Sequence, residues 1–223
     1  MELVKSKNNL KSGKVVAFVP IKLNSKRCPR KNIRELGSKP LVKYILETLK
    51  KIPEIDEIYV YCSDELIVKY IPNGVQFLQR DEKLDADETL GIEIYKSFVN
   101  EVAADTYILA HATSPFITAE SIRNALYMVI ENNFDSSFCV QEVKNFAWYQ
   151  DAPLNYNIYN IPRTQDIEPV YIETSAFFIF KESVLRKTGS RIGKNPYKAV
   201  VGEIEGIDID TQEEFRIAEK LIM

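Results

Sequence analysis

The apolar run from Val15 to Ile21 restricts the fold of this chain more than any other segment. It is short, rich in β-branched residues and nearly uncharged, which is typical of a strand buried on both faces of a parallel sheet. Further strands are expected at 57–62, 75–78, 106–110, 135–140, 171–180 and 199–204, and helices at 40–51, 64–71, 89–103, 118–132, 181–187 and 212–222. This alternation predicts an α/β fold with a doubly wound, mostly parallel sheet.

A loop rich in cations follows the first strand. Within it lie Lys22, Lys26, Arg27, Arg30 and Lys31, together with the small polar residues Asn24 and Ser25. Ligands of open α/β sheets bind at the carboxyl ends of the strands, and lysine and arginine side chains donate to phosphate oxygens. Backbone amides would add donors if the loop curls into a nest. We therefore expect a site for a phosphate chain here, with an ordinary solvated loop as the alternative.

A polar turn follows the expected strand at 106–110 and precedes a helix for which Thr118 is a plausible N-cap. The turn carries Thr113 and Ser114, and just before it stands His111, the single histidine of the chain. A lone histidine beside an apolar run is usually a structural residue. Because this position keeps hydrogen-bonding capacity, we interpret it as a contact to a nucleotide or sugar rather than as a base.

Two carboxylates lie close together near the C-terminal end of the sequence. Asp208 and Asp210 are two residues apart on an extended segment, so that both point to one face. Neighbouring carboxylates repel each other unless a cation lies between them, and hard oxygen ligands suit Mg²⁺. The alternative is a helix start, where Asp210 or Thr211 caps the helix and acidic residues complement its dipole. Both interpretations can hold together.

Taken together, these segments resemble the acylneuraminate cytidylyltransferases, which make CMP-activated sugars. The resemblance covers nearly all of residues 15–223 and is carried by Asn24-Ser25-Lys26, Pro29, Lys31-Asn32, 36–41, 78–89, 113–115 and 206–219. The chain departs from the family in having Lys22 where an arginine is usual, Arg27 where a glycine is usual, and Glu88 between Asp87 and Thr89. The resemblance implies a Rossmann-like nucleotide-diphospho-sugar transferase fold in a single domain over 13–223.

The resemblance also implies a reaction and the residues that perform it. A sugar hydroxyl, the anomeric one in that family, would attack the α-phosphorus of CTP and release pyrophosphate. The residues implied as catalytic are Lys26, Lys22 and Asp210, and Asp208 and Asp210 would bind Mg²⁺ as the cofactor. The implied nucleotide contacts are Lys22, Asn24, Ser25, Lys26, Arg80, Asp87, His111, Thr113 and Ser114.

The sugar side is less well defined by the resemblance. It implies contacts from Arg163, Gln165, Glu173, Thr174 and Ser175, where Glu173 stands at a position at which the family has a cation. An acidic sugar would lose a carboxylate partner there, so a neutral acceptor is nearly as consistent. Two other functions stay open: a nucleotide-sugar-binding protein without catalysis, and a metal-dependent glycosyltransferase. Neither GxxxxGK[ST] nor GxGxxG occurs, which argues against a P-loop ATPase.

Composition limits the partners of the protein. A net charge of −3 over 223 residues does not indicate binding to nucleic acid or acidic membranes. No apolar run approaches the roughly 20 residues that span a bilayer. Residues 1–12 are expected to be a flexible leader without a signal core, and the protein is expected to be cytoplasmic with its three cysteines reduced. An insert at 144–170 is rich in aromatic and turn residues, and the resemblance implies that it forms a homodimer and closes the sugar site.

Overall fold

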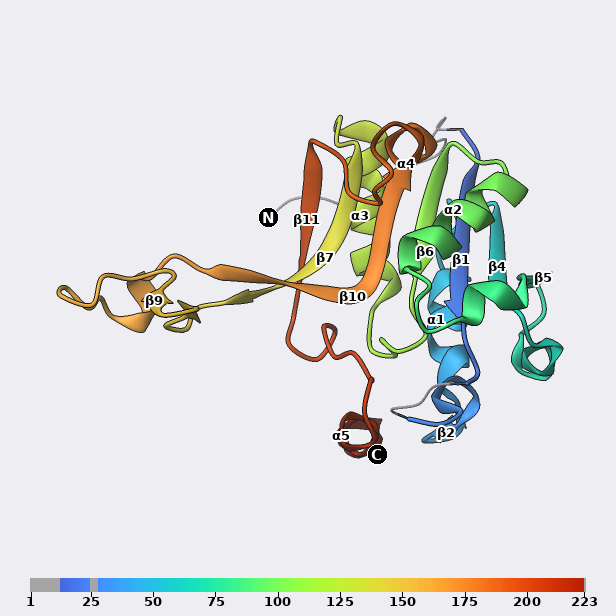
Figure 1. Cartoon of the computed structure of the whole chain (residues 1–223), viewed down its shortest axis with the longest axis horizontal. Coiled ribbons are helices and arrows are strands. Elements are labelled where there is room, and N and C mark those ends of the chain that lie inside the picture. The colour runs from blue at the N-terminus through green and yellow to red at the C-terminus, as the bar shows by residue number, and fades with distance from the viewer. Residues whose placement is uncertain (1–12, 25–27, 223) are drawn as a thin grey trace.

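The computed structural model describes residues 13–24 and 28–222, and it is built on a seven-stranded sheet with the strand order β11-β7-β10-β6-β1-β4-β5 (Figure 1). The predicted leader lies outside the described residues. The strands are β1 (Val15–Ile21), β4 (Glu57–Cys62), β5 (Gln76–Gln79), β6 (Thr106–Ala110), β7 (Ser136–Val143), β10 (Val170–Lys181) and β11 (Pro196–Val201). All neighbouring strands are parallel except β10, which is antiparallel to both β6 and β7. The predicted doubly wound, mostly parallel sheet is confirmed.

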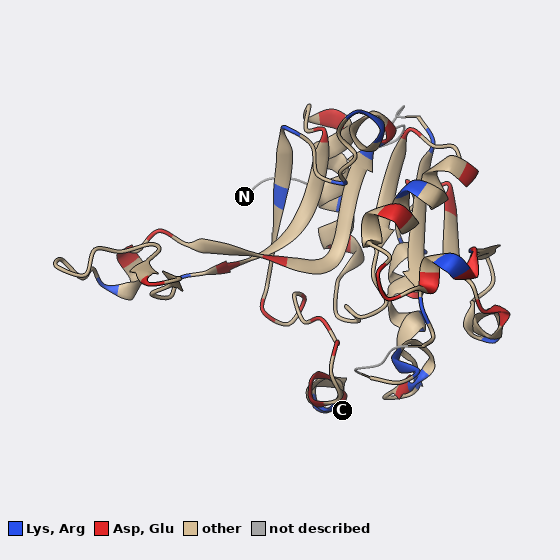
Figure 2. Cartoon of the chain, viewed as in Figure 1, with Lys and Arg blue, Asp and Glu red and all other residues tan. Residues whose placement is uncertain are grey.

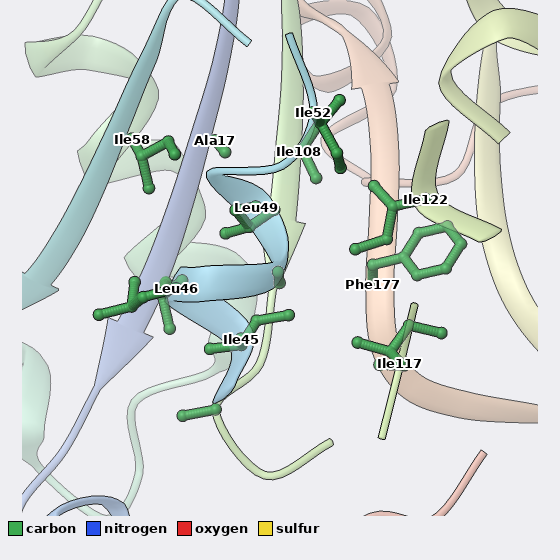
Figure 3. Packing of buried hydrophobic residues seen from close by; sticks show 14 of the residues in the cluster. Ala17, Ile45, Leu46, Leu49, Ile52, Ile58, Ile108, Ile117, Ile122 and Phe177 are labelled. Carbon is green, nitrogen blue, oxygen red and sulfur yellow. The ribbon is translucent and has the colours of Figure 1, made fainter. Parts of the chain in front are cut away.

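Helices cover both faces of this sheet because β1 is apolar on both of its sides. Val15, Ala17 and Val19 pack with α1 (Leu41–Leu49) and α3 (Ala119–Glu131) on one face. Figure 3 shows Ile45, Leu46 and Leu49 of α1 pointing towards the sheet. Val16 and Phe18 pack with α2 (Gly91–Glu101) and α4 (Glu182–Thr188) on the other face. The result is a three-layer α/β/α body, as expected when parallel strands are buried on both faces.

Several elements differ in detail from the sequence prediction. The helix expected at 64–71 is a 3-10 helix, η2 (Glu65–Tyr70), whose N-cap Asp64 accepts a hydrogen bond from the Leu66 N–H at 2.9 Å. The strand expected at 199–204 is β11, which begins at Pro196 and ends at Val201, since its ladder with β7 ends there and a turn begins after Gly202. Three further 3-10 turns were not predicted: η1 (Lys31–Ile33), η3 (Glu82–Asp85) and η4 (Thr164–Asp166).

A small third cluster joins the loop after β1 to the C-terminal helix α5 (Gln212–Ile222). The loop contains a two-stranded ribbon, β2 (Glu35–Leu36) and β3 (Lys39–Pro40), which turns at Gly37 with a φ of 61°. Phe215 and Ala218 of α5 are buried against Leu36 and Leu41. Ile217 and Leu221 of the same helix are exposed. The helix is therefore held by one narrow face.

The predicted insert forms an arm that projects from the body (Figure 1). It contains the short ribbon β8 (Trp148–Tyr149) and β9 (Ala152–Pro153), and it leaves and re-enters the sheet through β7 and β10. Most of its large side chains are exposed, with Trp148 at 57% and Tyr159 at 91%. The few internal contacts include the Trp148 Nε1–H, which donates to the Tyr156 hydroxyl at 2.8 Å.

The three cysteines, Cys28, Cys62 and Cys139, are buried and free, as the sequence predicts for reduced thiols. Burial raises the pKa of Cys139 to about 11, so that its thiol is protonated at neutral pH. No helix in the described part of the chain has the length and apolar character needed to cross a membrane.

Candidate active site

A pocket of about 430 Å³ opens where the strand order reverses beside β1. The chain adds β4 and then β5 on one side of β1 and places β6 on the other side, which makes the crevice between the ends of β1 and β6 the expected ligand site of such a sheet. The lining residues come from the segments after β1, after β6, on β10 and before α5: Pro20, Lys22, Asn24, Lys31, Asn32, Asp87, His111, Ala112, Thr113, Ser175, Asp208 and Asp210.

Lys22 stands at one wall of the pocket. Its ammonium group donates to the carbonyl oxygen of Asp85 and lies 3.5 Å from Asp87 Oδ1. Asp87 also lines the pocket, as predicted. Asn32, which we did not predict as a site residue, donates from Nδ2 to the Lys22 carbonyl at 3.1 Å and holds the backbone where the loop leaves β1. The predicted position of Lys22 at the ligand site is therefore consistent with its place in the pocket.

Arg80 lies behind this wall and is not among the residues that line the pocket. It is 2% exposed, and its guanidinium donates to the carbonyl oxygens of Ile21 at 3.0 Å and Tyr61 at 3.3 Å. It also forms an ion pair with Asp85, whose second oxygen accepts from the Ser63 hydroxyl. Arg80 thus ties the ends of β1 and β4 to η3, and the nucleotide contact that we predicted for it stays a prediction.

Lys31 faces the opposite wall and is the most buried cation of the pocket. Its Nζ donates to Asp210 Oδ1 at 2.7 Å and to the Ile209 carbonyl at 2.8 Å. The sequence identified Lys31 only as one of five loop cations, because its partner lies 179 positions away in the chain. Arg30, by contrast, is exposed at a left-handed φ of 54°. Ser25, Lys26 and Arg27 lie outside the described residues.

Asp208 and Asp210 both line the pocket, as the alternation of an extended segment predicts. Ile209 between them points the other way into the third cluster, and its N–H donates to the Thr113 carbonyl at 2.8 Å. Asp208 Oδ1 is buried and has no hydrogen-bond donor among the described residues. A buried carboxylate oxygen without a donor is costly unless a cation compensates it. This donor set fits Mg²⁺, which takes one or two carboxylates together with phosphate oxygens.

The helix-start interpretation of the same segment is also confirmed. The Thr211 hydroxyl accepts from the Glu214 N–H at 3.2 Å, while Glu214 Oε2 accepts from the N–H groups of Asp210 at 2.8 Å and Thr211 at 2.7 Å. This reciprocal capping fixes the backbone on which Asp210 sits. Burial by itself raises the pKa of Glu214, but these hydrogen bonds outweigh it, so that the pKa lies below its ordinary value.

His111 closes the pocket on the β10 side. Its Nδ1 contacts the carbonyl oxygen of Ser175, which can only accept, so that Nδ1 carries the proton and Nε2 is left as an acceptor. Burial lowers the pKa of His111, and the positive charge of Arg191 is among the causes that lower it further. The imidazole is therefore neutral at neutral pH, and its role as a contact to a nucleotide or sugar rather than a base stays a prediction.

Some of the other predicted nucleotide and sugar contacts lie at or near the pocket, and the rest lie on the arm. Asn24, Thr113 and Ser175 line the pocket, while Ser114 and Thr174 are buried and are not among its lining residues. Arg163 and Gln165 lie on the arm, where Arg163 pairs with Asp166 of its own turn at 2.6 Å. Glu173 pairs with Arg191. Within this chain, the arm residues and the pocket are not brought together.

The family model for cytidylyltransferases matches residues 16–221, so the chain belongs to the cytidylyltransferase family. Among curated relatives, the N-acylneuraminate cytidylyltransferase of Oncorhynchus mykiss is 25% identical over 94% of this chain and 50% of that protein. The pseudaminic acid cytidylyltransferase of Campylobacter jejuni subsp. jejuni serotype O:2 is 24% identical over 93% of this chain and 96% of that protein. This chain spans about half the length of the first N-acylneuraminate relatives.

Solved structures support the fold. CMP:2-keto-3-deoxy-manno-octonic acid synthetase complexed with CTP superposes with a TM-score of 0.71 at 15% identity, over 94% of this chain and 98% of that one. The 4-diphosphocytidyl-2C-methyl-D-erythritol synthase of Anaerococcus prevotii superposes with a TM-score of 0.68 at 15% identity, over 94% of this chain and 98% of that one. The predicted nucleotidyltransferase fold is confirmed.

Proposed function

We propose that this protein transfers CMP from CTP to a hydroxyl group of a sugar acid and releases pyrophosphate. The observation that carries the proposal is the pocket at the strand crossover, in which Asp208 and Asp210 share one cavity with Lys22 and Lys31. Its volume of about 430 Å³ lies in the usual range for small-molecule sites. The names of the relatives, among them N-acylneuraminate and pseudaminic acid cytidylyltransferases, support a sugar acid as the acceptor.

The chain's own residues would work by alignment and charge neutralisation. Lys22 and Lys31 would bind the triphosphate, joined by Lys26, and Asn24, Thr113 and the Nε2 acceptor of His111 would fix the nucleotide. The acceptor oxygen forms a bond to the α-phosphorus as the bond from that phosphorus to the leaving pyrophosphate breaks. Asp208 and Asp210 would hold Mg²⁺, which neutralises charge on the phosphate oxygens when bound.

The arm supports a homodimer as part of the same proposal. Its exposed aromatic side chains are of the kind that anchors protein interfaces, and Arg163 and Gln165 on it would reach the sugar site of the second copy. A cytoplasmic location is also proposed. The three free, buried cysteines suit a reducing compartment.

The direct test measures pyrophosphate release from each of the four nucleoside triphosphates, with Mg²⁺ and a panel of acidic and neutral sugars. We expect release from CTP with a sugar acid, and a loss of about 100- to 1,000-fold in Asp210→Asn. Glu131→Gln is the control, since it removes the same charge from an exposed site at the end of α3, outside the pocket and the arm. CTP binding without turnover would instead indicate a binding protein, and transfer from a preformed nucleotide sugar would indicate a glycosyltransferase.

A further inference from the structure

We infer that Arg191 binds the carboxylate of the acceptor sugar acid, an inference that rests on the proposed function. A sugar acid carries a negative charge of its own in addition to those of the triphosphate. The two described lysines of the pocket already contact carboxylates, Lys22 that of Asp87 and Lys31 that of Asp210. The acceptor therefore needs a cation elsewhere on the rim of the pocket.

Arg191 lies just beyond the β10 wall of the pocket. His111 lines the pocket, and its ring meets the ring of Phe178 edge-on with centroids 6.3 Å apart. The guanidinium carbon of Arg191 stands 3.6 Å from the centroid of that same Phe178 ring. The row His111–Phe178–Arg191 thus leads outward from the pocket, and the Arg191 side chain is still 28% exposed at its end. An acceptor that occupies the His111 side of the pocket would meet this cation.

Three side chains from two elements, α2 and β10, hold the guanidinium in place. Nη1 donates to the Tyr95 hydroxyl of α2 at 3.1 Å, and Nη2 donates to Glu173 Oε1 of β10 at 3.0 Å. Phe178 supports its flat face. A guanidinium has five N–H donors. Apart from the two hydrogen bonds to Tyr95 and Glu173, those of Arg191 have no partner among the described residues. A planar guanidinium that is held rigidly and still has unused N–H groups can donate to both oxygens of a carboxylate.

Among the described residues, Arg34 also pairs with a distant carboxylate, Glu219, and stacks on Phe215, but that ring belongs to the third cluster and not to β10. Two other arginine pairs are local. Arg163 pairs with Asp166 and Arg186 pairs with Glu182, in each case within one turn and at an exposed position. Arg191 pairs with Glu173 across 18 positions and stacks on an aromatic ring next to the pocket wall. Glu173 then has a defined role: it shares the guanidinium with the acceptor and weakens the binding of the acidic sugar that Arg191 recognises.

The test compares acceptor kinetics of the full chain and of Arg191→Gln, with the sugar acid that supports pyrophosphate release in the wild type. We expect the KM for this acceptor to rise by about 10- to 100-fold, as is usual when a charged hydrogen-bonding partner is removed, while the KM for CTP is unchanged. The amide of the same sugar, which has the same ring without the charge, should bind equally poorly to both proteins. Arg186→Gln is the control arginine and should behave like the wild type.

A second variant separates recognition from a merely structural role. Glu173→Gln removes the competing carboxylate and leaves the arginine, so the KM for the sugar acid should fall by about two- to fivefold. A structural ion pair would weaken activity in both variants, whereas recognition of a carboxylate moves the two in opposite directions. An acceptor KM that is the same in Arg191→Gln and the wild type, or that rises in both variants, would overturn the inference while the proposed function stands. Failure of the wild type to release pyrophosphate with any acceptor would instead overturn the proposed function itself.

Discussion

The pocket and the arm are built on opposite principles, although strand β10 serves both. The pocket lies at the end of a sheet that is covered on both faces, where Phe18 stacks on Phe98 with ring centroids 4.2 Å apart. The arm projects from the body without such layers (Figure 1), and most of its large aromatic side chains are exposed. A catalytic site needs side chains with fixed geometry. A surface that binds a partner needs exposed large side chains that the partner can bury. The comparison teaches that the chain contains one region that packs its own core and one whose large side chains stay exposed, and the homodimer proposed for the arm would cover these side chains.

Charge is distributed to match this difference. Figure 2 shows lysine and arginine segments grouped around β2, next to the loop that supplies the pocket. Several of these cations are held by contacts to residues far away in the sequence, as in the pairs Lys31–Asp210 and Arg34–Glu219. The charged pair on the arm, Arg163–Asp166, is local. The pocket thus depends on tertiary packing for its electrostatics, and the arm does not.

Removing one core ring tests the first half of the comparison. Phe18→Ala should destabilise the protein by about 3–5 kcal/mol, because it empties a fully buried site between the sheet and α2. Phe146→Ala is the matched change on the arm, where the ring packs on Tyr156 at 4.7 Å and remains partly exposed. Its cost should stay below about 1.5 kcal/mol. Urea unfolding of both variants measures the difference, and equal costs would break the comparison.

Removing one arm ring tests the second half. Trp148→Ala should weaken association of the proposed dimer by about 10- to 100-fold, since exposed tryptophans are frequent hot spots of interfaces. Sedimentation over a range of protein concentrations measures this, with Leu90→Ala as an exposed apolar control outside the arm. A wild-type protein that remains monomeric at high concentration would contradict the proposal that the arm forms a homodimer.

The cap of α5 gives a smaller effect with a defined pH dependence. The pKa of Glu214 is below its ordinary value, so the carboxylate stabilises the fold above about pH 4.3 and this stabilisation is lost as pH falls through the lower, folded-state pKa. Glu214→Gln should cost about 1 kcal/mol at pH 7, and the difference from the wild type should vanish in acid. Glu213→Gln, at an exposed neighbouring position, is the control. Unfolding free energies from pH 7 to pH 3 test this, and a pH-independent difference would contradict it.

Local patterns predicted much of this molecule correctly. The uncharged run of β1 identified the central strand, and the two-residue spacing of Asp208 and Asp210 identified one face of the pocket. These features depend on periodicity, which sequence carries directly. The ion pair of Lys31 and Asp210 and the structural contacts of Arg80 depend on which distant backbone atoms meet, which periodicity does not contain. The early end of β11 likewise follows from its ladder with β7.

The central claim is the proposal that Asp208 and Asp210 hold a Mg²⁺ ion that binds together with the nucleotide. Calorimetric titration of CTP with and without Mg²⁺ tests it most directly, in the wild type, in Asp208→Asn and in the control Glu131→Gln, which is exposed at the end of α3. We predict that Mg²⁺ strengthens CTP binding by at least about tenfold in the wild type and the control, and that Asp208→Asn loses this dependence, since Asp208 Oδ1 is the buried acceptor without a donor among the described residues. Equal Mg²⁺ dependence in all three proteins would contradict the account.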